Sequence, residues 1–439
     1  MKYLIPSLLS LFLIFVTTPQ TRIRADDSKR PNFVIIMADD LGFGDLSCFH
    51  GWINTPHLNQ LAKSGLRLTD YHSNGAVCSP TRAALLTGRY QQRVGIPRVI
   101  VANPKAAEHR NGLPEKETTF AEALQQQGYA TAIFGKWHLG YFPQFNPRLH
   151  GFQEFRGYVS GNVDFFSHVD QAGNADWWHN QQRVNESGYV THLITAHAVR
   201  FLEEHQDRPF CLYLPHEAPH YPYQGPHDKA DRSPGGSFAN HGSRVDKKQA
   251  YREMVEELDK GVGQIVQKLQ QLEIDQKTVI FFCSDNGATR LGSNAPFRGH
   301  KGSVWEGGHR VPAIAYWPGK IKPRESNQTM LSMDLMPTLL ALADANADKF
   351  AFDGIDVSEH WLAAADLPER TLFWDTTKSQ AVRDGAWKLV QQNNSKSPQL
   401  FQLTVDPKES KDVSQQQPQI RDQLSTKLKN WKKAVQSAR

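Results

Sequence analysis

The sharpest chemical signal in this chain is the run CSPTR, which starts at Cys78. Ser79 is a helix-capping residue type, Pro80 suits the first turn of a helix, and Gly88 suits a helix end. Cys78 is therefore predicted to lie at a helix N-terminus, where free backbone N–H groups favour an anion. Arg82 follows about one helical turn later and could neutralise the same anion. The pattern indicates a nucleophile beside an oxyanion site, whereas a lone cysteine before a helix would be interpreted as a buried structural thiol.

Two pairs of oxygen-bearing side chains are candidates for a metal site. Asp39 and Asp40 form one pair, and Asp285 and Asn286 form the other. Carboxylate and carboxamide oxygens are hard donors that suit Ca²⁺ or Mg²⁺ rather than zinc. Two aspartates after a strand are weak evidence when taken alone, because carboxylates are common in turns.

Lys136 and His138 form a further candidate pair, two residues apart. On an extended segment, side chains at this spacing share a face. An ammonium group and an imidazole on one face suit an anionic ester, and the alternative is a lysine and a histidine that merely lie at the edge of a strand.

Four short, continuous apolar runs are predicted to be strands that are buried on both faces. They are Asn32–Ala38, Ala130–Phe134, Phe210–Leu214 and Thr278–Cys283. Helical patterns lie between them at Pro56–Ser64, Thr119–Gln127, Tyr189–His205 and Lys247–Leu272. Strands that alternate with helices predict an α/β fold, with a mostly parallel sheet between two layers of helices.

Each of the four predicted strands runs directly into a polar cluster. The clusters contain Asp39 and Asp40, Lys136 and His138, His216 and His220, and Asp285 and Asn286. In sheets of this kind, ligands bind beyond the carboxyl ends of the strands. We therefore expect these side chains to gather in one site.

Composition limits the classes of protein that this chain can belong to. It has 439 residues, with 50 Lys and Arg against 45 Asp and Glu and a net charge of +5, which is too even for a nucleic-acid scaffold. Hydrophobic residues make up 39% and charged residues 22%, which excludes a disordered chain and a polytopic membrane protein. The length predicts one large domain with a smaller attachment, or two domains.

Residues 1–25 have the pattern of a removable export signal. Lys2 precedes an apolar run from Tyr3 to Val16, and Ala25 offers a small residue for cleavage. The run is short for a bilayer span, so stable membrane insertion is not expected, although an uncleaved anchor is the alternative. We expect an exported protein that is periplasmic or secreted.

Beyond about residue 345 the pattern changes. Thr371–Val390 and Leu400–Leu403 predict short strands, and apolar residues at helical spacing within Gln415–Arg439 predict a closing helix. The expected organisation is a main α/β domain at 26–345 and a smaller C-terminal α+β domain at 346–439. Within the main domain, Gly161–Asn180 is a long polar and aromatic loop, a kind of segment that is commonly functional.

The motif C-x-P-x-R followed by AALLTGR resembles the signature of the type I, formylglycine-dependent sulfatases. The motifs DDLGFGD, GKWHLG, APHYP, SDNG and KGSVWEGGHRVP extend this resemblance over most of the chain. Thr81 is a mild departure, because serine is more usual at this position. The segment Gly135–His150 is most similar to the branch that contains arylsulfatase A and N-acetylgalactosamine-6-sulfatase.

The resemblance implies an alkaline-phosphatase-like fold and a sulfuric ester hydrolase. In this family a formylglycine-generating enzyme oxidises the motif cysteine, here Cys78, to formylglycine (3-oxoalanine), and the aldehyde hydrate is the nucleophile. The matching metal positions are Asp39, Asp40, Asp285 and Asn286, which with residue 78 would hold one divalent cation, expected to be Ca²⁺ rather than Mg²⁺.

The resemblance also implies roles for the cationic and imidazole side chains. Arg82 and Lys136 would bind sulfate oxygens, and His138 would drive the elimination of sulfate. His220 and Lys301 would contact the ester and the leaving oxygen. His216 and His309 are interpreted as bystanders, although either could touch substrate.

The expected substrate is a sulfated carbohydrate, for which Trp177 and Trp178 could provide a stacking platform. One alternative is a formylglycine-dependent phosphonate monoester or phosphodiester hydrolase, which shares the nucleophile chemistry. A second is a non-enzymatic protein that binds sulfated glycans, although the chain retains every charged position of the site. No nucleic-acid partner is expected.

Overall fold

The computed structural model describes residues 30–236 and 238–436. The predicted export signal at residues 1–25 lies outside this part of the chain. Within the described residues, no helix is both long enough and apolar enough to cross a membrane.

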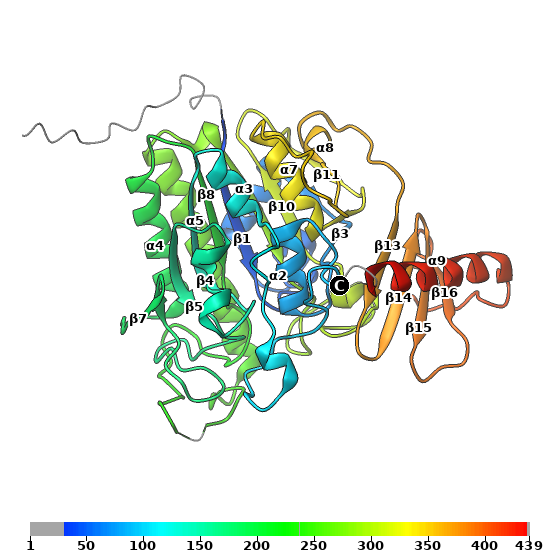
Figure 1. Cartoon of the computed structure of the whole chain (residues 1–439), viewed down its shortest axis with the longest axis horizontal. Coiled ribbons are helices and arrows are strands. Elements are labelled where there is room, and N and C mark those ends of the chain that lie inside the picture. The colour runs from blue at the N-terminus through cyan, green and yellow to red at the C-terminus, as the bar shows by residue number, and fades with distance from the viewer. Residues whose placement is uncertain (1–29, 237, 437–439) are drawn as a thin grey trace, which may run out of the picture.

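A ten-stranded mixed sheet forms the centre of the molecule, in the order β11-β2-β10-β9-β1-β8-β4-β5-β6-β7 (Figure 1). Its parallel central strands are β1 (Asn32–Ala38), β4 (Ala130–Lys136), β5 (Glu154–Tyr158), β8 (Phe210–Pro215) and β9 (Thr278–Ser284). The four predicted strands are confirmed, and three of them extend one or two residues further toward the polar clusters. The prediction of a mostly parallel α/β sheet is confirmed with them.

The sheet has short edge strands that the sequence pattern did not reveal. They are β2 (Leu66–Leu68), β6 (Trp178–His179), β7 (Gln182–Arg183), β10 (Ala313–Tyr316) and β11 (Arg324–Ser326). A separate two-stranded sheet pairs β3 (Tyr71–His72) with β12 (Met330–Leu331). Runs of two to four residues are too short to show a period, which is why sequence reasoning missed them.

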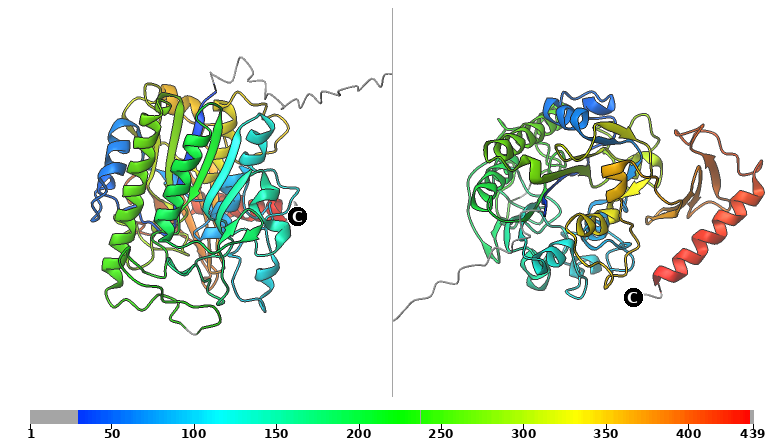
Figure 2. Two further views of the ribbon diagram at one scale, coloured as in Figure 1. Left: turned by 90° about the vertical axis from the view of Figure 1, so that its left-hand side faces the viewer. Right: turned by 90° about the horizontal axis from the view of Figure 1, so that it is seen from above.

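Helices cover both faces of the sheet (Figure 2). One layer contains α2 (Cys78–Thr87), α3 (Phe120–Gln126), α7 (Leu335–Leu342) and α8 (Ser358–Ala363). The other contains α1 (Pro56–Ser64), α4 (Val190–Glu204) and α5 (Lys247–Gln271). Along β1, Phe33, Ile35 and Met37 pack against the first layer, and the alternate residues pack against the second. This two-sided burial explains the continuous apolar runs.

Single turns connect these elements. They are α6 (Glu306–His309) and the 3₁₀ turns η1 (Ser47–Phe49), η2 (Ala107–Arg110), η3 (Pro143–Phe145), η4 (Pro147–His150), η5 (Asp275–Lys277) and η6 (Ser332–Asp334).

The C-terminal part forms a small antiparallel sheet beside the large one (Figure 1). Its strands are β13 (Thr371–Asp375), β14 (Ser379–Asp384), β15 (Trp387–Gln392) and β16 (Gln399–Gln402), and α9 (Pro418–Gln436) packs on β14 and β15. The predicted α+β character is confirmed. The preceding helix α8 packs instead on α7, and its Trp361 stacks on Phe281 in the core of the large sheet.

Candidate active site

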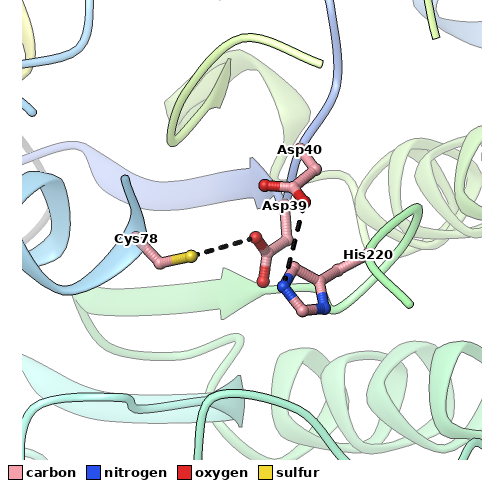
Figure 3. Close-up of side chains that lie close together, drawn as sticks. All are labelled: Asp39, Asp40, Cys78 and His220. Carbon is pink, nitrogen blue, oxygen red and sulfur yellow. Dashed lines mark hydrogen bonds and ion pairs between the residues drawn. The ribbon is translucent and has the colours of Figure 1, made fainter. Parts of the chain in front are cut away.

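Side chains from three separate segments converge beyond the ends of the central strands (Figure 3). Asp39 and Asp40 follow β1, Cys78 begins α2, and His220 lies in the loop after β8. One ligand atom from each of these four residues lies within 4.8 Å of the others. The expected gathering of polar clusters at one edge of the sheet is therefore present.

Helix α2 begins at Cys78, as predicted, but Ser79 is not its cap. Val77 occupies the N-cap position in an extended conformation, and the Ser79 hydroxyl accepts a hydrogen bond from the Ile100 N–H at 3.2 Å. The helix ends at Gly88, whose φ of +68° is the left-handed conformation that glycine tolerates best. All ten helix residues are buried, and the Cys78 thiol points at Asp39 Oδ1, 3.6 Å away.

The threonine in the CSPTR run has a structural role. The Thr81 hydroxyl donates to the Gly75 carbonyl at 2.9 Å and accepts from the Gly75 N–H at 3.1 Å. These bonds hold the segment before α2 against the first turn of the helix. A hydroxyl is what this position requires, so threonine in place of serine leaves the arrangement intact.

Asp285 and Asn286 contact the two adjacent aspartates. Asp285 Oδ1 accepts from the Asp40 N–H at 3.2 Å, and Asn286 Nδ2 donates to Asp40 Oδ1 at 2.7 Å. Asp40 has a φ of +66°, a conformation that aspartate adopts more readily than most residues. This backbone turn lets two consecutive carboxylates enter the same site.

The Asn286 side chain has an oxygen without a partner. Its Oδ1 is buried and accepts no hydrogen bond from any residue that the structure describes. A buried polar atom in that state is costly unless another group satisfies it. Because carboxylates of Asp39, Asp40 and Asp285 surround the same region, the donor set fits a divalent cation with oxygen ligands.

Three cations balance the three carboxylates. Lys136 forms an ion pair with Asp39, Arg82 Nη2 lies 2.8 Å from Asp285 Oδ2, and Lys301 Nζ lies 2.7 Å from Asp40 Oδ1. Lys136 and Arg82 are fully buried, whereas the Lys301 side chain is 19% exposed. The site therefore holds paired charges and reaches solvent at Lys301.

The buried charges shift one another's pKa values. Burial alone would raise the pKa of Asp39, but the charges of Lys136 and Arg82 hold it well below its usual range. Burial raises the pKa of Asp40, and burial together with the charge of Asp39 raises the pKa of Asp285 to about 7. A divalent cation would favour the ionised form of all three carboxylates.

His138 differs from the sequence expectation in its backbone. β4 ends at Lys136, and His138 has a φ of +54°, so the two residues do not lie on one face of an extended segment. His138 Nε2 lies 2.9 Å from the Ile100 carbonyl, and its Nδ1 has no partner in the described chain. Burial and the nearby Lys136 hold the pKa of His138 well below its usual range.

A carbonyl can only accept a hydrogen bond, so each site histidine has a defined tautomer. His138 carries its proton on Nε2 and presents an Nδ1 lone pair. His220 carries its proton on Nδ1, which lies 2.7 Å from the Tyr221 carbonyl, and its Nε2 lies 3.8 Å from Asp40 Oδ2. Burial and Lys301 hold the pKa of His220 well below its usual range, so both rings are neutral near pH 7.

The expected aromatic platform is not formed by the tryptophan pair. Trp177 is buried, its ring stacks on His168, and its Nε1 donates to Glu186. Trp178 is half-buried and lies under Arg183. The prediction is wrong for Trp177, because the loop packs this ring into the protein.

His216 is buried with neither ring nitrogen bonded to a described residue.

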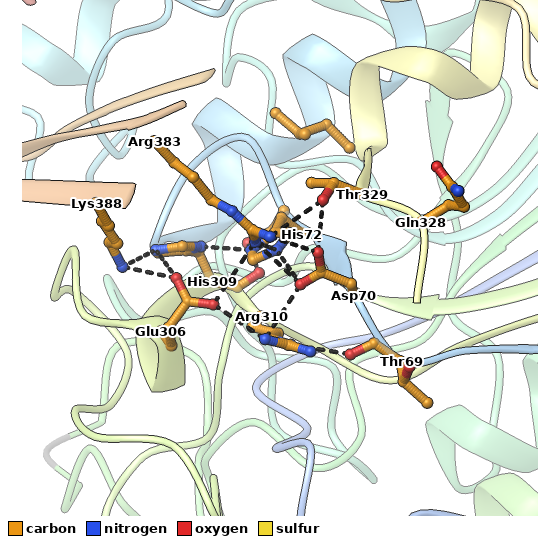
Figure 4. A network of polar contacts seen from close by, with 12 residues as sticks. Thr69, Asp70, His72, Glu306, His309, Arg310, Gln328, Thr329, Arg383 and Lys388 are labelled. Atoms are coloured by element: carbon orange, nitrogen blue, oxygen red, sulfur yellow. Dashed lines mark hydrogen bonds and ion pairs between the residues drawn. The ribbon is translucent and has the colours of Figure 1, made fainter. Parts of the chain in front are cut away.

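Sequence reasoning missed a second buried cluster, which we call the interface network (Figure 4). It consists of Asp70, His72, Glu306, His309, Arg383 and Lys388. His72 and His309 face each other with their Nδ1 atoms 2.9 Å apart, and Lys388 lies 2.7 Å from Glu306. Arg383 binds both oxygens of Asp70, at 3.0 and 2.8 Å.

The interface network joins the small domain to the segments that carry site residues. Arg383 and Lys388 come from β14 and β15, whereas His309 follows Lys301 in the chain and its carbonyl accepts from the Ser73 N–H at 2.7 Å. The only sequence signal was that Glu306 and His309 lie within the KGSVWEGGHRVP motif. The sequence analysis treats His309 as a bystander. Its contacts instead give it a structural role in the interface network.

The fold and the site define an alkaline-phosphatase-like hydrolase of sulfuric esters, and comparison with known proteins agrees. The Sulfatase family model matches residues 31–345, and the chain belongs to this family.

Relatives match over most of the chain. It is 35% identical to human (Homo sapiens) arylsulfatase A over 81% of this chain and 72% of that protein. It is 34% identical to N-acetylgalactosamine-6-sulfatase of Canis lupus familiaris, over 78% of this chain and 68% of that protein. Among solved structures, Ps i-CgsB in complex with k-i-k-neocarrahexaose has a TM-score of 0.82 and 28% identity, with 92% of each chain covered.

Proposed function

We propose that this protein hydrolyses sulfate esters of a carbohydrate, with formylglycine formed from Cys78 as nucleophile and one Ca²⁺ in the site. The observation that carries the proposal is the buried Cys78 at the start of α2, surrounded by three carboxylates that are paired with three cations. The carbohydrate class is supported by a relative named for a sulfated sugar and by a similar structure solved with an oligosaccharide.

The cation would be held by Asp39, Asp40, Asp285 and Asn286 together with residue 78. The unpartnered Asn286 oxygen supports this assignment, because a cation would satisfy it. When bound, the cation and the aldehyde hydrate supply an activated hydroxyl nucleophile and offset negative charge on sulfate. Maturation would require a formylglycine-generating enzyme, and the export signal expected at 1–25 would direct the protein to the periplasm or the exterior.

The role of the buried cations is to bind the sulfate group. Arg82 and Lys136 are fixed by Asp285 and Asp39, so their donors are oriented before the substrate arrives. Preorganised charge of this kind stabilises the negative charge that develops on the oxygens in the transition state. Because the side-chain charges of the cluster balance, the positive charge of a bound cation would be available to attract the ester.

Two separate proton transfers fall to different residues. The Nδ1 lone pair of His138 can accept a proton during release of sulfate, because its Nε2 proton is held by the Ile100 carbonyl. The leaving sugar oxygen needs a proton donor, and Lys301 carries one. Neutral His220 presents a lone pair at Nε2, so it can accept a hydrogen bond from a sugar hydroxyl next to the ester and hold the ester beside Lys301.

Replacement of the nucleophile tests the proposal. Cys78→Ala is expected to abolish hydrolysis of 4-nitrophenyl sulfate and of sulfated sugars, while Cys211→Ala, which removes another buried thiol in β8, keeps turnover. Mass spectrometry of the peptide that contains residue 78 measures the conversion of thiol to aldehyde. Full activity in protein that contains only unmodified Cys78 would contradict the mechanism. Faster turnover of a matched phosphonate monoester would favour the alternative hydrolase.

A further inference from the structure

A pocket of about 280 Å³ lies between the start of α2, the segment 97–101 and the turn that joins β13 to β14 in the small domain. Its volume is at the lower end for ligand sites, which begin at about 300 Å³. That size suits one sugar ring rather than an oligosaccharide. None of its lining residues has a role in the chemistry described above.

The pocket shares its wall with the active site. Val77 directly precedes Cys78, and Gly302 directly follows Lys301. The Gly302 N–H donates to the Ala76 carbonyl at 2.8 Å, which holds these two wall segments together. Val99 and Val101 flank the residue whose carbonyl binds His138. The pocket is therefore lined by residues that are next to Cys78 and Lys301 in the chain.

The lining combines an apolar surface with a few charged groups. Val77, Pro80 and Val99 supply aliphatic area, and Arg98 and Asp375 supply a donor and an acceptor. A pyranose ring presents the matching features, with C–H groups on its faces and hydroxyls around its edge. Apolar walls with a small number of placed polar groups are typical of pockets for small organic ligands.

The two charged groups hold each other only weakly. Arg98 Nη2 and Asp375 Oδ2 are 3.7 Å apart, which is too far for a hydrogen bond, and the other carboxylate oxygen, Asp375 Oδ1, is buried. The Arg98 side chain is 35% exposed, and its Nη1 donates to the backbone carbonyls of Pro97 and Asp375. Both side chains therefore have bonding capacity left for hydroxyl groups of a ligand.

The pocket has more negative than positive charge, whereas the charged side chains of the active site are balanced. Glu108 and Asp375 place two carboxylates around the single guanidinium of Arg98. A second sulfate group would meet these carboxylates and be repelled, whereas a hydroxyl can donate to them. The lining thus favours an uncharged ring.

We propose that this pocket binds an unsulfated sugar ring that adjoins the sulfated position of the substrate, with Asp375 and Arg98 bonded to its hydroxyls. The inference rests on the proposed function and deepens it. Asp375 belongs to β13, so the small domain takes part in the choice of substrate. A simple aryl sulfate has no second ring that could occupy the pocket.

The test compares two substrates of the mature enzyme. 4-Nitrophenyl sulfate lacks a sugar, and the second substrate is the sulfated disaccharide that the wild type hydrolyses fastest in a screen of sulfated galactose, galactosamine and glucosamine disaccharides. The quantity measured is the ratio of kcat/KM for the disaccharide to kcat/KM for the aryl ester. Asp375→Asn and Arg98→Gln are each expected to lower this ratio at least tenfold, through a higher KM for the disaccharide.

Asp384→Asn is the matched control, because Asp384 lies on the next strand of the small sheet and pairs with Lys427. It should leave the ratio unchanged. As a second readout, binding of the unsulfated product disaccharide to Cys78→Ala protein should weaken at least tenfold when Asp375→Asn is added. An unchanged ratio, or unchanged product binding, would overturn the inference. A wild type that hydrolyses neither ester would overturn the proposed function, and the inference would fall with it.

Discussion

The unpartnered oxygen of Asn286 leads to a prediction about metal content. Removal of bound Ca²⁺ should lower the melting temperature, because a ligand at a hundred- to a thousandfold excess over Kd stabilises the folded state by about 3 to 4 kcal/mol. Asp285→Ala should lower the metal content per chain and the rate. Metal analysis and calorimetry with and without a chelator measure both effects. Asp422→Ala on exposed α9 is the control, and normal metal content in Asp285→Ala would contradict the assignment.

The tautomers of the site histidines lead to a prediction about kinetics. His138→Ala should release one equivalent of desulfated product in a burst and then stall, because the proton acceptor for sulfate release is missing. Lys301→Ala should slow the first step, most for a sugar alcohol as leaving group and least for an aryl ester. Rapid-quench kinetics on both esters distinguish the effect of His138→Ala from that of Lys301→Ala. Equal losses on both substrates, with no burst, would contradict this division.

Much of this residue-level picture could be predicted from sequence, because motifs are local. The nucleophile segment, the carboxylates and Lys136 each lie within a few residues of a strand or helix end. The assignment of Ser79 as a cap was wrong because a tertiary contact with Ile100 takes its hydroxyl. The tautomer of His138 could not be predicted, since it depends on the Ile100 carbonyl, which only the fold brings near.

At the scale of elements, the loop after β5 restricts the position of His138. A Cβ added at Gly161 would lie 2.8 Å from His138 Nε2, closer than atoms can approach without a shift. Gly161→Ala should therefore push the ring away from the Ile100 carbonyl. Displacements of about 1 Å cost on the order of a hundredfold in rate.

Turnover of 4-nitrophenyl sulfate by Gly161→Ala measures this effect, and the melting temperature is the control. Gly161 is half-buried and its φ is not positive, so alanine fits its backbone without strain and the melting temperature should change little. A rate equal to that of the wild type would show that His138 has room to move without loss.

The central strands and main helices were predictable because long elements carry a clear period and two-sided burial leaves continuous apolar runs. The short strands β10 and β2 were not, because runs of three and four residues show no period. The order of strands likewise depends on contacts that no local pattern encodes.

At the scale of the whole molecule, the interface network fixes the small domain to the large one. Burial would raise the pKa of Asp70, but Arg383, Arg310 and His72 hold it well below its usual range. A carboxyl whose pKa is lower in the folded state contributes stability above its unfolded pKa of about 4. That contribution is lost as the pH falls from there through the folded-state pKa.

Asp70→Asn should therefore reduce the free energy of unfolding at pH 7 by about 3 to 5 kcal/mol, the usual cost of breaking a buried ion pair. The difference from the wild type should shrink as the pH falls below about 4. Thermal unfolding between pH 3 and pH 8 measures it, with exposed Asp348→Asn as the control. A destabilisation that is constant over this range would indicate lost packing instead of a lost charge. Sequence reasoning could not predict this pair, because Asp70 and Arg383 lie in different domains.

The interface network also sets an order of events while the chain is being made. Lys388 is roughly 300 residues behind Cys78, so at ribosomal rates of about 5 to 20 residues per second the thiol leaves the ribosome on the order of 15 to 60 s earlier. Until Lys388 and Arg383 arrive, Glu306, His309 and Asp70 lack their buried partners, and the walls around α2 are incomplete. In the finished protein Cys78 is 2% exposed. The last sixth of the chain must be made before the interface network is complete, and we expect an enzyme that modifies the Cys78 thiol to act before that point.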